Sequence, residues 1–273
     1  KEKPMRVSIS VATTPSAMPQ IMFAGHFEDH CRLLAAMGYE GVDLFFPNPR
    51  DADAEAARKI LDGCGLRATM LAAAGDIMAD GLFLNDPSRR AELLERSRPH
   101  LEMAAQLGAM PNVGFLRGRH GKRPGESLRH MAEGLAAYCE LAQTMGVDVL
   151  LEPICRYEID SILTTDQAIE LCTLAGSPSN LGLLLDLFHM NIEEPSVCGA
   201  ICRAGTLIRH VHFVDNTRAV PGMGCLNLQD VVACLKAVGY AGFLGIEAVP
   251  GPDPEEKARR GLAFTRTLLN AAP

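Results

Sequence analysis

The feature that most constrains this chain is the alternation of short apolar runs with longer amphipathic segments along its whole length. The apolar runs have the length and composition of buried strands, and the segments between them have helical spacing. The expected strands are Arg6–Ala12, Gly41–Phe45, Leu66–Ala72, Pro111–Phe115, Val147–Glu152, Leu181–Asp186, Arg209–Val214 and Phe243–Ala248. The expected helices are Phe27–Met37, Ala52–Cys64, Ser88–Leu107, Glu126–Met145, Thr165–Ala175, Pro195–Ala204, Leu228–Val238 and Pro254–Asn270.

Eight strand–helix units in succession favour a parallel sheet that closes on itself. We therefore predict an α/β fold, a (β/α)8 TIM barrel that forms a single domain over residues 1–273. A doubly wound open sheet is the main rival. It would gather its ligands at one crevice, and the G-x-G-x-x-G motif of dinucleotide sites does not follow the first expected strand.

Composition and charge argue against several classes of function. The formal net charge of −7 disfavours nucleic acid as a partner, because an acidic surface repels phosphates. No apolar stretch approaches the roughly 20 residues of a membrane-spanning helix, so no membrane partner is expected. The 9 cysteines are scattered without a C-x-x-C pair, which favours a reduced, cytoplasmic setting over a disulfide framework. The N-terminal residues read as charge followed by a strand rather than as a signal sequence.

Four of the expected strands carry a metal-binding side chain at or near their C-terminal end. VDVLLE ends on Glu152, LGLLLD on Asp186 and FLGIE on Glu247, while RHVHF carries His212 near its end. A carboxylate at the end of an apolar run costs desolvation free energy unless something pairs with it. In a (β/α)8 barrel these positions share the C-terminal rim, where active sites are built. The set predicts one divalent cation, with Mn²⁺ expected and Mg²⁺ or Co²⁺ as alternatives.

Glu152 and Glu247 are expected on opposite sides of this cation, so they could reach a substrate carbon from its two faces. One carboxylate would remove a proton next to a carbonyl, and the metal would stabilise the enediolate. Return of the proton to the other face gives epimerisation, whereas return to the adjacent carbon gives aldose–ketose isomerisation. Either glutamate alone could equally be a buried ion-pair partner. The four strand-end ligands together favour catalysis.

Two further histidines lie near these candidates. His189 follows Asp186 by three residues and could turn into the mouth of the barrel or lie on the surface. His210 and His212 are two residues apart on one expected strand, so they face the same side. His212 is the better ligand candidate because it lies nearer the strand end. His210 is expected one layer deeper, as a group that supports a ligand or as a core histidine.

Four segments carry the strongest motifs: LEPICRYE (Leu151–Glu158), LLLDLFHM (Leu183–Met190), HVHFVDNTRAVPGMG (His210–Gly224) and FLGIEAVP (Phe243–Pro250). Together they resemble the sugar isomerase/epimerase barrels, the xylose-isomerase-like proteins that include D-tagatose and D-psicose 3-epimerases, L-ribulose 3-epimerase and hydroxypyruvate isomerase. The resemblance implies that Glu152, Asp186, His212 and Glu247 are metal ligands. It also implies that Glu152 and Glu247 form the acid/base pair.

The same resemblance implies that Glu158, His189 and Arg218 grip the carbonyl end of the sugar and its neighbouring hydroxyls. Arg218 lies in a Pro- and Gly-flanked loop directly after the seventh expected strand. A guanidinium beside a metal site can donate several hydrogen bonds to substrate oxygens. Glu158 lies six residues beyond Glu152, past the strand end, so it can reach over the site.

Some residues depart from the pattern of the ketohexose epimerases in this family. Cys155 stands where their LNRYE or LNRFE motif has Asn, and Ala248 follows the last expected ligand. The chain has no Trp to pack against the far end of a sugar. These departures argue against free D-tagatose or D-psicose as the substrate. Phe45, Phe46 and Phe115 could supply the apolar wall instead, or belong to the core.

The loop FLRGRHGKRPG after the fourth expected strand is strongly basic. It carries Arg117, Arg119, His120, Lys122 and Arg123. On the catalytic rim of an acidic protein such a cluster could bind the phosphate or carboxylate end of a substrate. The alternative is a solvated loop or a contact between subunits.

The leading hypothesis is a divalent-metal-dependent sugar isomerase/epimerase of carbohydrate metabolism. We expect a ketose 3-epimerase that acts on a small sugar or keto-polyol, with an anionic substrate left open. A metal-dependent lyase or dehydratase of a keto-cyclitol or a 3-dehydroshikimate-like acid, or a hydroxypyruvate-type isomerase, would begin with the same proton removal. A repair endonuclease would need more histidines and a basic groove, and a non-enzymatic binding barrel would leave the paired glutamates unexplained. A homo-oligomer, a dimer or tetramer, is expected because exposed barrel helices often pair.

Overall fold

The computed structural model describes residues 4–16, 18–46, 53–72 and 74–271. Its strands are β1 (Arg6–Ala12), β2 (Phe23–Ala24), β3 (Gly41–Phe45), β4 (Arg67–Ala72), β5 (Met110–Pro111), β6 (Val149–Leu151), β7 (Leu181–Asp186), β8 (Ile208–His212) and β9 (Phe243–Ile246). Its helices are α1 (Phe27–Met37), α2 (Ala54–Cys64), α3 (Gly75–Ala79), α4 (Arg90–Leu107), α5 (Pro124–Thr144), α6 (Thr165–Leu174), α7 (Leu187–Glu193), α8 (Val197–Ala204), α9 (Leu228–Ala237) and α10 (Pro254–Asn270). Single 3-10 turns occur at η2 (Phe115–Arg117) and η3 (Gly205–Leu207).

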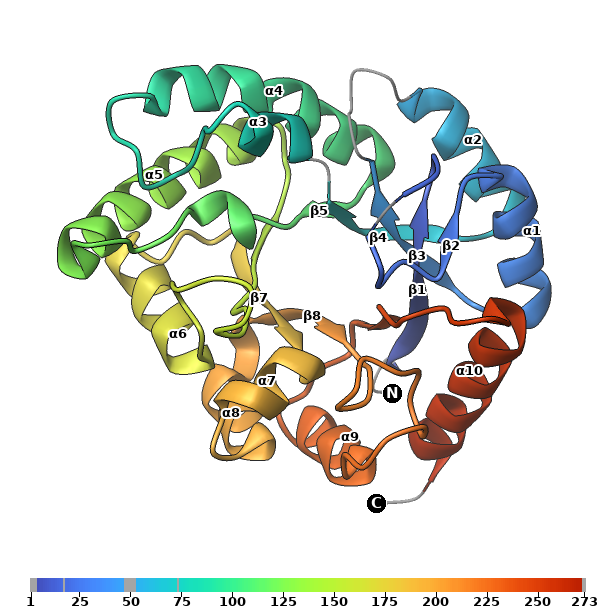
Figure 1. The fold of residues 1–273 in the computed structure, drawn as a ribbon. Helices are drawn as coiled ribbons and strands as arrows, with labels where there is room; N and C mark the ends of the chain where they lie inside the picture. Colours follow the sequence, from blue (N-terminus) through green and yellow to red (C-terminus); the bar gives the residue numbers. More distant parts are fainter. Residues whose placement is uncertain (1–3, 17, 47–52, 73, 272–273) are drawn as a thin grey trace.

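The paired strands run parallel in the order β5-β4-β3-β1-β9-β8-β7-β6. The two ends of this order meet where Asn112, directly after β5, forms a parallel bridge to Leu150 in β6. Figure 1 shows the strands near the middle of the molecule, surrounded by helices. The predicted α/β class and (β/α)8 TIM barrel are therefore confirmed. The short strand β2 is an addition that pairs with the end of β1.

One predicted strand is wrong over most of its length. Of the expected strand Pro111–Phe115, only Pro111 lies in a strand, at the end of β5. The chain then leaves the sheet and enters η2. The cause is local, because the side-chain oxygen of Asn112 accepts a hydrogen bond from Gly114 N at 2.9 Å. An amide side chain that bonds its own backbone two residues on favours a turn over a strand.

The other differences from the expected elements are small. The helix expected at 52–64 begins at Ala54, and Ala52 lies outside the described residues. Three short elements, β2, α3 and α7, lie within segments that were expected to be loops. Among the helices of the described residues, none combines the length and apolar character needed to cross a bilayer.

The interior of the barrel is partly polar. An inner apolar cluster is formed by Ala12, Ile21, Phe45, Met70, Leu150 and Leu184. Ser8, Asp43 and Thr69 lie on strands that also contribute to this cluster, and His210 lies on β8. Ser8, Asp43 and His210 are fully buried, and Thr69 is nearly so. Asp43 on β3 contacts His210 on β8 although these strands are not neighbours in the sheet, so the contact crosses the barrel interior. This polar layer lies beneath the rim described below.

Helix α5 packs closely against the segment that follows α3. A Cβ added to Gly134 in this helix would overlap the carbonyl oxygen of Leu84 and lie 2.8 Å from its carbonyl carbon. Both atoms belong to the backbone, so neither can rotate away. The absence of a side chain at Gly134 therefore sets how closely α5 approaches the segment that follows α3.

We expect Gly134→Ala to lower the free energy of unfolding by about 1–3 kcal/mol, the usual cost of overpacking. Gly63→Ala in α2 is the matched control, because an added Cβ there has nothing within 4 Å. It should leave stability unchanged or raise it by up to about 1 kcal/mol, since alanine has the higher helix propensity. Urea denaturation followed by circular dichroism measures both. A Gly134→Ala variant as stable as the wild type would contradict this packing.

Candidate active site

The four predicted ligands come together at the C-terminal ends of neighbouring strands. Asp186 ends β7 and His212 ends β8, while Glu152 and Glu247 directly follow β6 and β9. These strands are adjacent in the order β9-β8-β7-β6. Parallel strands end at the same rim, so the fold itself collects the four side chains. All four are buried.

His212 Nδ1 lies at the centre of the group. It is 3.5 Å from Asp186 Oδ2, 3.6 Å from Glu247 Oε2 and 3.9 Å from Glu152 Oε1. Three carboxylates thus face one imidazole nitrogen in a buried setting. Such a group is unfavourable unless positive charge stands among the carboxylates.

These atoms fit a divalent cation. One ligand atom each from Glu152, Asp186 and His212 lie within 4.8 Å of one another. Asp186 Oδ2 and His212 Nδ1 are buried and have no hydrogen-bond partner among the described residues. Two carboxylate oxygens and an imidazole nitrogen suit Mn²⁺, Mg²⁺ or Co²⁺. Glu247, the fourth predicted ligand, lies beside this trio and bonds Arg218 instead.

The local charges shift several pKa values. Burial raises the pKa of Glu247 to about 7, although the charges of His212 and Arg218 oppose this. Burial alone would lower the pKa of His212, but Glu247 and Asp186 outweigh it and raise the value to about 10. Burial would raise the pKa of Asp186, yet His189 and its other cationic neighbours hold it below its ordinary value. Without a cation the site therefore holds protons.

Arg218 is the cation that reaches this group from the loop after β8. Its guanidinium donates to Glu247 Oε2 at 2.6 Å and to Glu158 Oε1 at 3.1 Å, and it lies 3.5 Å from Asp186 Oδ2. Its backbone is left-handed, with φ 58°. A non-glycine residue held in that region marks a position fixed by its surroundings. Val249 N donates to the Arg218 carbonyl oxygen at 2.8 Å, which ties the loop to the segment that follows β9.

The loop that carries Arg218 is built around the buried carboxylate of Asp215. That carboxylate accepts hydrogen bonds from the backbone of Gly222 at 3.1 Å and Leu226 at 3.0 Å. A Cβ on Gly224 would overlap Asp215 Oδ1, so this turn needs a glycine. The Pro/Gly-rich sequence therefore gives a shaped loop that presents Arg218 to the site.

The remaining predicted residues also lie at the site. His189 lies on α7, with Nε2 3.8 Å from Asp186 Oδ2 and 3.9 Å from Glu152 Oε1. It is buried, so the surface alternative is wrong. Glu158 is half-buried and pairs with Arg218. The structure thus gathers the residues that the sequence indicated as metal ligands, acid/base pair and sugar contacts, while these roles stay predictions.

Sequence reasoning missed two polar residues beside the ligands. Asn112 donates from Nδ2 to Glu152 Oε2 at 2.6 Å, whereas the other oxygen of that carboxylate faces His212. Asp43 lies within ion-pair distance of His212 and His210. A signal was present for Asp43, because a charged residue within the apolar strand GVDLF needs a buried partner. Asn112 gave no comparable signal, since polar residues are common after strands.

A cavity of about 700 Å³ opens above the ligands. Glu152, Glu247, His189, Glu158 and Arg218 line one part of it. The rest of the lining is largely apolar and includes Phe45, Phe46, Phe115, Met18, Met70, Met78 and Ile154. The three phenylalanines proposed from the sequence as an apolar wall therefore line the cavity.

Arg117, from the basic loop, does not face the cavity. It is fully buried, and its guanidinium donates to the carbonyl oxygens of Glu152 at 2.8 Å, Ser161 at 2.7 Å and Ile162 at 3.1 Å. Burial lowers the pKa of Arg117 to about 9, which leaves it charged at neutral pH. Its role is to hold the backbone at the end of β6 against the 161–162 segment.

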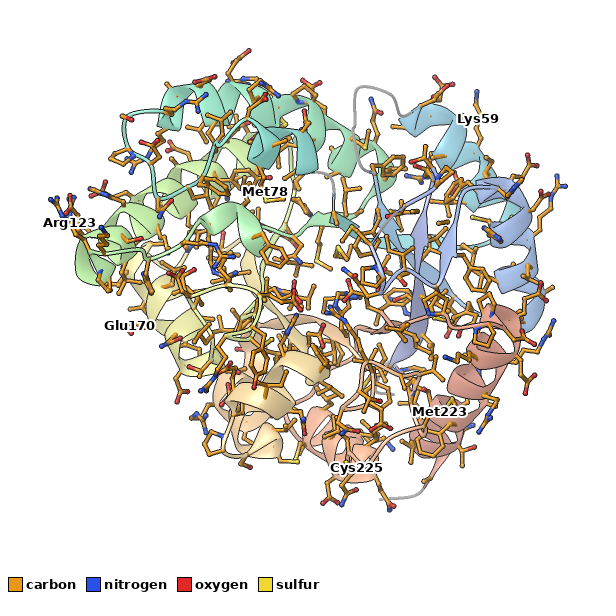
Figure 2. The ribbon with its side chains drawn as sticks, viewed as in Figure 1. Lys59, Met78, Arg123, Glu170, Met223 and Cys225 are labelled. Atoms are coloured by element: carbon orange, nitrogen blue, oxygen red, sulfur yellow. The ribbon has the colours of Figure 1, made fainter. Side chains whose placement is uncertain are left out.

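The other basic residues of this loop also point elsewhere. Arg119 donates to the Glu158 carbonyl oxygen at 2.6 Å, and the His120 backbone binds Asp160 at 3.0 Å. Lys122 and Arg123 are exposed, and Figure 2 shows Arg123 at the outer edge of the molecule. None of these residues lines the cavity. The loop therefore gives no support to an anion-binding site for substrate.

Comparison with known proteins agrees with this geometry. Residues 31–268, which include all the predicted ligands, match the xylose isomerase-like TIM barrel family. The chain belongs to this family. The family predicted from the sequence motifs is thereby confirmed.

Two curated relatives are epimerases. The chain is 29% identical over 238 residues to L-ribulose 3-epimerase of Mesorhizobium japonicum. This alignment covers 85% of this chain and 78% of the relative. It is 26% identical over 260 residues to ketose 3-epimerase of Arthrobacter globiformis, covering 91% and 88%. A solved structure of D-psicose 3-epimerase with D-tagatose from Clostridium cellulolyticum H10 is similar with a TM-score of 0.82 and 20% identity, over 98% of this chain and 100% of that one. That last similarity shows a shared fold.

Protons and a divalent cation would compete for the Glu247 carboxylate, so the stabilisation by the cation should depend on pH. Its folded pKa of about 7 exceeds the ordinary 4.5, so in the metal-free protein its stability contribution is present below pH 4.5 and lost as pH rises through 7. A cation needs the ionised carboxylate, so it competes with protons at low pH. We expect Mn²⁺ to raise the melting temperature more at pH 8 than at pH 6. Differential scanning calorimetry measures this.

The matched control for this measurement is Glu247→Gln, which has no carboxylate to titrate and should show a smaller difference between the two pH values. An equal or larger Mn²⁺ effect at pH 6 in the wild type would contradict the prediction.

Proposed function

We propose that the chain is a divalent-metal-dependent ketose 3-epimerase that acts on an uncharged sugar or keto-polyol. The observation that carries this proposal is the placement of Glu152 and Glu247. Both carboxylates approach His212 Nδ1 and both line the cavity floor. The curated relatives named as 3-epimerases support the broader assignment to carbohydrate epimerases and isomerases.

Glu152, Asp186, His212 and Glu247 would hold the metal ion. When bound, a divalent cation polarises the carbonyl and hydroxyl oxygens of a substrate and stabilises the negative charge left after proton removal. The donor set and the unpartnered Asp186 Oδ2 support this assignment. Mn²⁺ as the physiological ion and assembly as a dimer or tetramer stay predictions.

In the proposed reaction one of the two glutamates removes the proton from carbon 3 of the ketose. The other glutamate returns a proton to the opposite face of the same carbon, which inverts its configuration. Arg218, His189 and Glu158 surround this position and would orient the carbonyl and adjacent hydroxyls. The apolar wall of Phe45 and Phe46 would exclude water from the site, which protects the intermediate from side reactions.

The cavity lining favours an uncharged substrate over a phosphate or carboxylate. Among the described residues that line it, Arg218 is the one Arg or Lys, and its guanidinium already binds Glu247 and Glu158. A dehydratase acting on a keto acid would need, besides the metal ion, a cationic side chain free to hold the carboxylate. The same absence argues against phosphorylated sugars.

Loss of either carboxylate should abolish most of the activity. We expect Glu152→Gln and Glu247→Gln each to lower kcat by at least about 10²-fold, the lower range for general acid–base catalysis. The assay incubates each enzyme with ketoses and Mn²⁺ in deuterated water. NMR then identifies the product and any deuterium at carbon 3. Glu170→Gln is the control, because Glu170 is exposed on the outer side of α6 (Figure 2). Activity of both variants at the wild-type level would refute the acid/base assignment.

The basic loop should not discriminate between substrates. We expect Lys122→Ala and Arg123→Ala to leave KM unchanged for a free ketose and for its phosphate, because these exposed side chains lie outside the cavity lining. Arg218→Ala provides the contrast, with a raised KM. Steady-state kinetics with both substrates measure the effect. A rise in KM for the phosphate alone in the loop variants would restore the anion-binding interpretation.

A further inference from the structure

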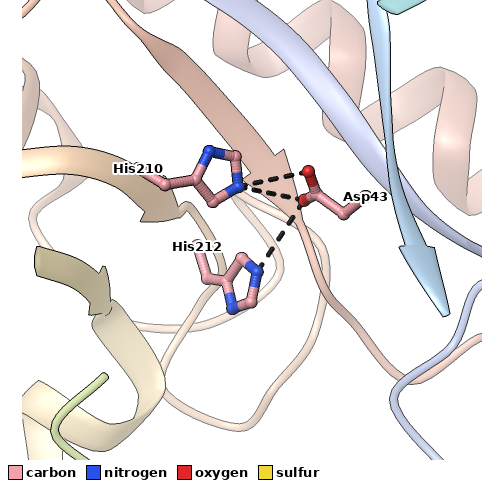
Figure 3. Close-up of side chains that lie close together, drawn as sticks. All are labelled: Asp43, His210 and His212. Atoms are coloured by element: carbon pink, nitrogen blue, oxygen red, sulfur yellow. Dashed lines mark hydrogen bonds and ion pairs between the residues drawn. The ribbon is translucent and has the colours of Figure 1, made fainter. Parts of the chain in front are cut away.

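A buried carboxylate lies directly beneath the proposed metal ligands. Asp43 on β3 is fully buried, and Figure 3 shows its carboxylate facing His210 and His212. It lies 3.2 Å from His210 Nε2 and 3.7 Å from His212 Nε2. Ser8 Oγ donates to it at 3.1 Å, and the Thr69 hydroxyl donates to the same oxygen. A buried charge costs several kcal/mol unless it is paired, and these neighbours provide the pairing.

The surrounding strands are shaped to hold this carboxylate. A Cβ on Gly245 of β9 would overlap Asp43 Oδ2 and lie 2.8 Å from His210 Nε2. The carboxylate comes from β3, and its hydrogen-bonding neighbours come from β1, β4 and β8. The glycine on β9 leaves room for these side chains. These contacts fix the position of Asp43 from several sides.

The two nitrogens of His212 have different surroundings. Nδ1 faces Asp186, Glu247 and Glu152, whereas Nε2 faces Asp43. A nitrogen that binds a metal carries no proton, so the ring proton must then reside on Nε2. A carboxylate opposite Nε2 stabilises that tautomer and the ring orientation that goes with it.

We propose that Asp43 is a positioning residue for the metal centre, which acts through His212 Nε2 to present Nδ1 to the cation. Ser8, Thr69 and His210 in turn hold the Asp43 carboxylate. The inference rests on the metal site of the proposed function. Nothing in it requires Asp43 to touch substrate, and Asp43 is absent from the cavity lining.

The same side chains could instead hold a second cation. Ligand atoms of Asp43, His210 and His212 lie within 4.8 Å of one another. However, Asp43 Oδ1 already accepts hydrogen bonds from Ser8 and Thr69, and Asp43 Oδ2 lies at hydrogen-bond distance from His210. We therefore expect one cation per chain, and the stoichiometry of binding forms part of the test.

The test compares the wild type with Asp43→Asn, which keeps the size of the side chain and removes its charge. Titration calorimetry of the metal-free proteins with Mn²⁺ should give one site in the wild type and about 10–100-fold weaker binding in the variant. In the Mg²⁺-loaded wild type, ¹H–¹⁵N NMR should show a His212 Nε2 proton protected from exchange, which is lost or shifted upfield in Asp43→Asn. A merely structural role would leave that signal in place in a folded variant.

A second pair of variants guards against misfolding. Thr69→Val removes one hydroxyl donor to Asp43 at nearly constant volume and should also weaken Mn²⁺ binding, whereas Thr69→Ser keeps the hydroxyl and should bind as the wild type does. Wild-type Mn²⁺ affinity in both Asp43→Asn and Thr69→Val, or two cations per wild-type chain, would overturn the proposal.

The outcomes separate this inference from the proposed function. If the wild type binds one Mn²⁺ and epimerises no ketose, while Asp43→Asn weakens binding, the positioning role stands and the proposed reaction fails. If the wild type epimerises a ketose and Asp43→Asn keeps full affinity and the Nε2 signal, the reaction stands and the positioning role fails.

Discussion

The site depends on three buried carboxylates held around one imidazole nitrogen. Glu152, Asp186 and Glu247 all lie within 3.9 Å of His212 Nδ1. Keeping like charges together out of water costs several kcal/mol per ion unless cations balance them. The closed parallel sheet leaves these groups little freedom to separate, because their four strands are neighbours that end at one rim. Arg218 supplies one positive charge, and a divalent cation would supply the remainder.

The side chains inside the barrel are arranged in layers along its axis. Asp43 and His210 form a polar layer that faces His212 from below, and the carboxylates face it from the opposite nitrogen. Above them the cavity is largely apolar and has few charged side chains besides those of the site. His212 therefore links the buried polar layer to the group of carboxylates at the rim.

The sequence predicted the parts of this structure that follow from repeated patterns. Strand-end residues such as Asp186 and His212 could be assigned to one rim because eight strand–helix units define a single topology. Arg117 could not be placed correctly, because its partners are carbonyl groups of the 161–162 segment, which no pattern links to the basic loop. Asp43 carried a signal, a charge inside an apolar strand, but its histidine partners lie across the barrel. Contacts of that kind depend on the closed sheet, so local sequence does not reveal them.

The most direct test of this arrangement is X-ray diffraction from crystals grown with Mn²⁺, using anomalous scattering at the manganese absorption edge. We expect one anomalous peak per chain, about 2.2 Å from oxygen or nitrogen atoms of Glu152, Asp186, His212 and Glu247. In that state Glu247 should have turned from Arg218 toward the ion. A peak that lies away from His212 Nδ1, or crystals with no peak at saturating Mn²⁺, would contradict the central claim that these strand ends form a single metal centre.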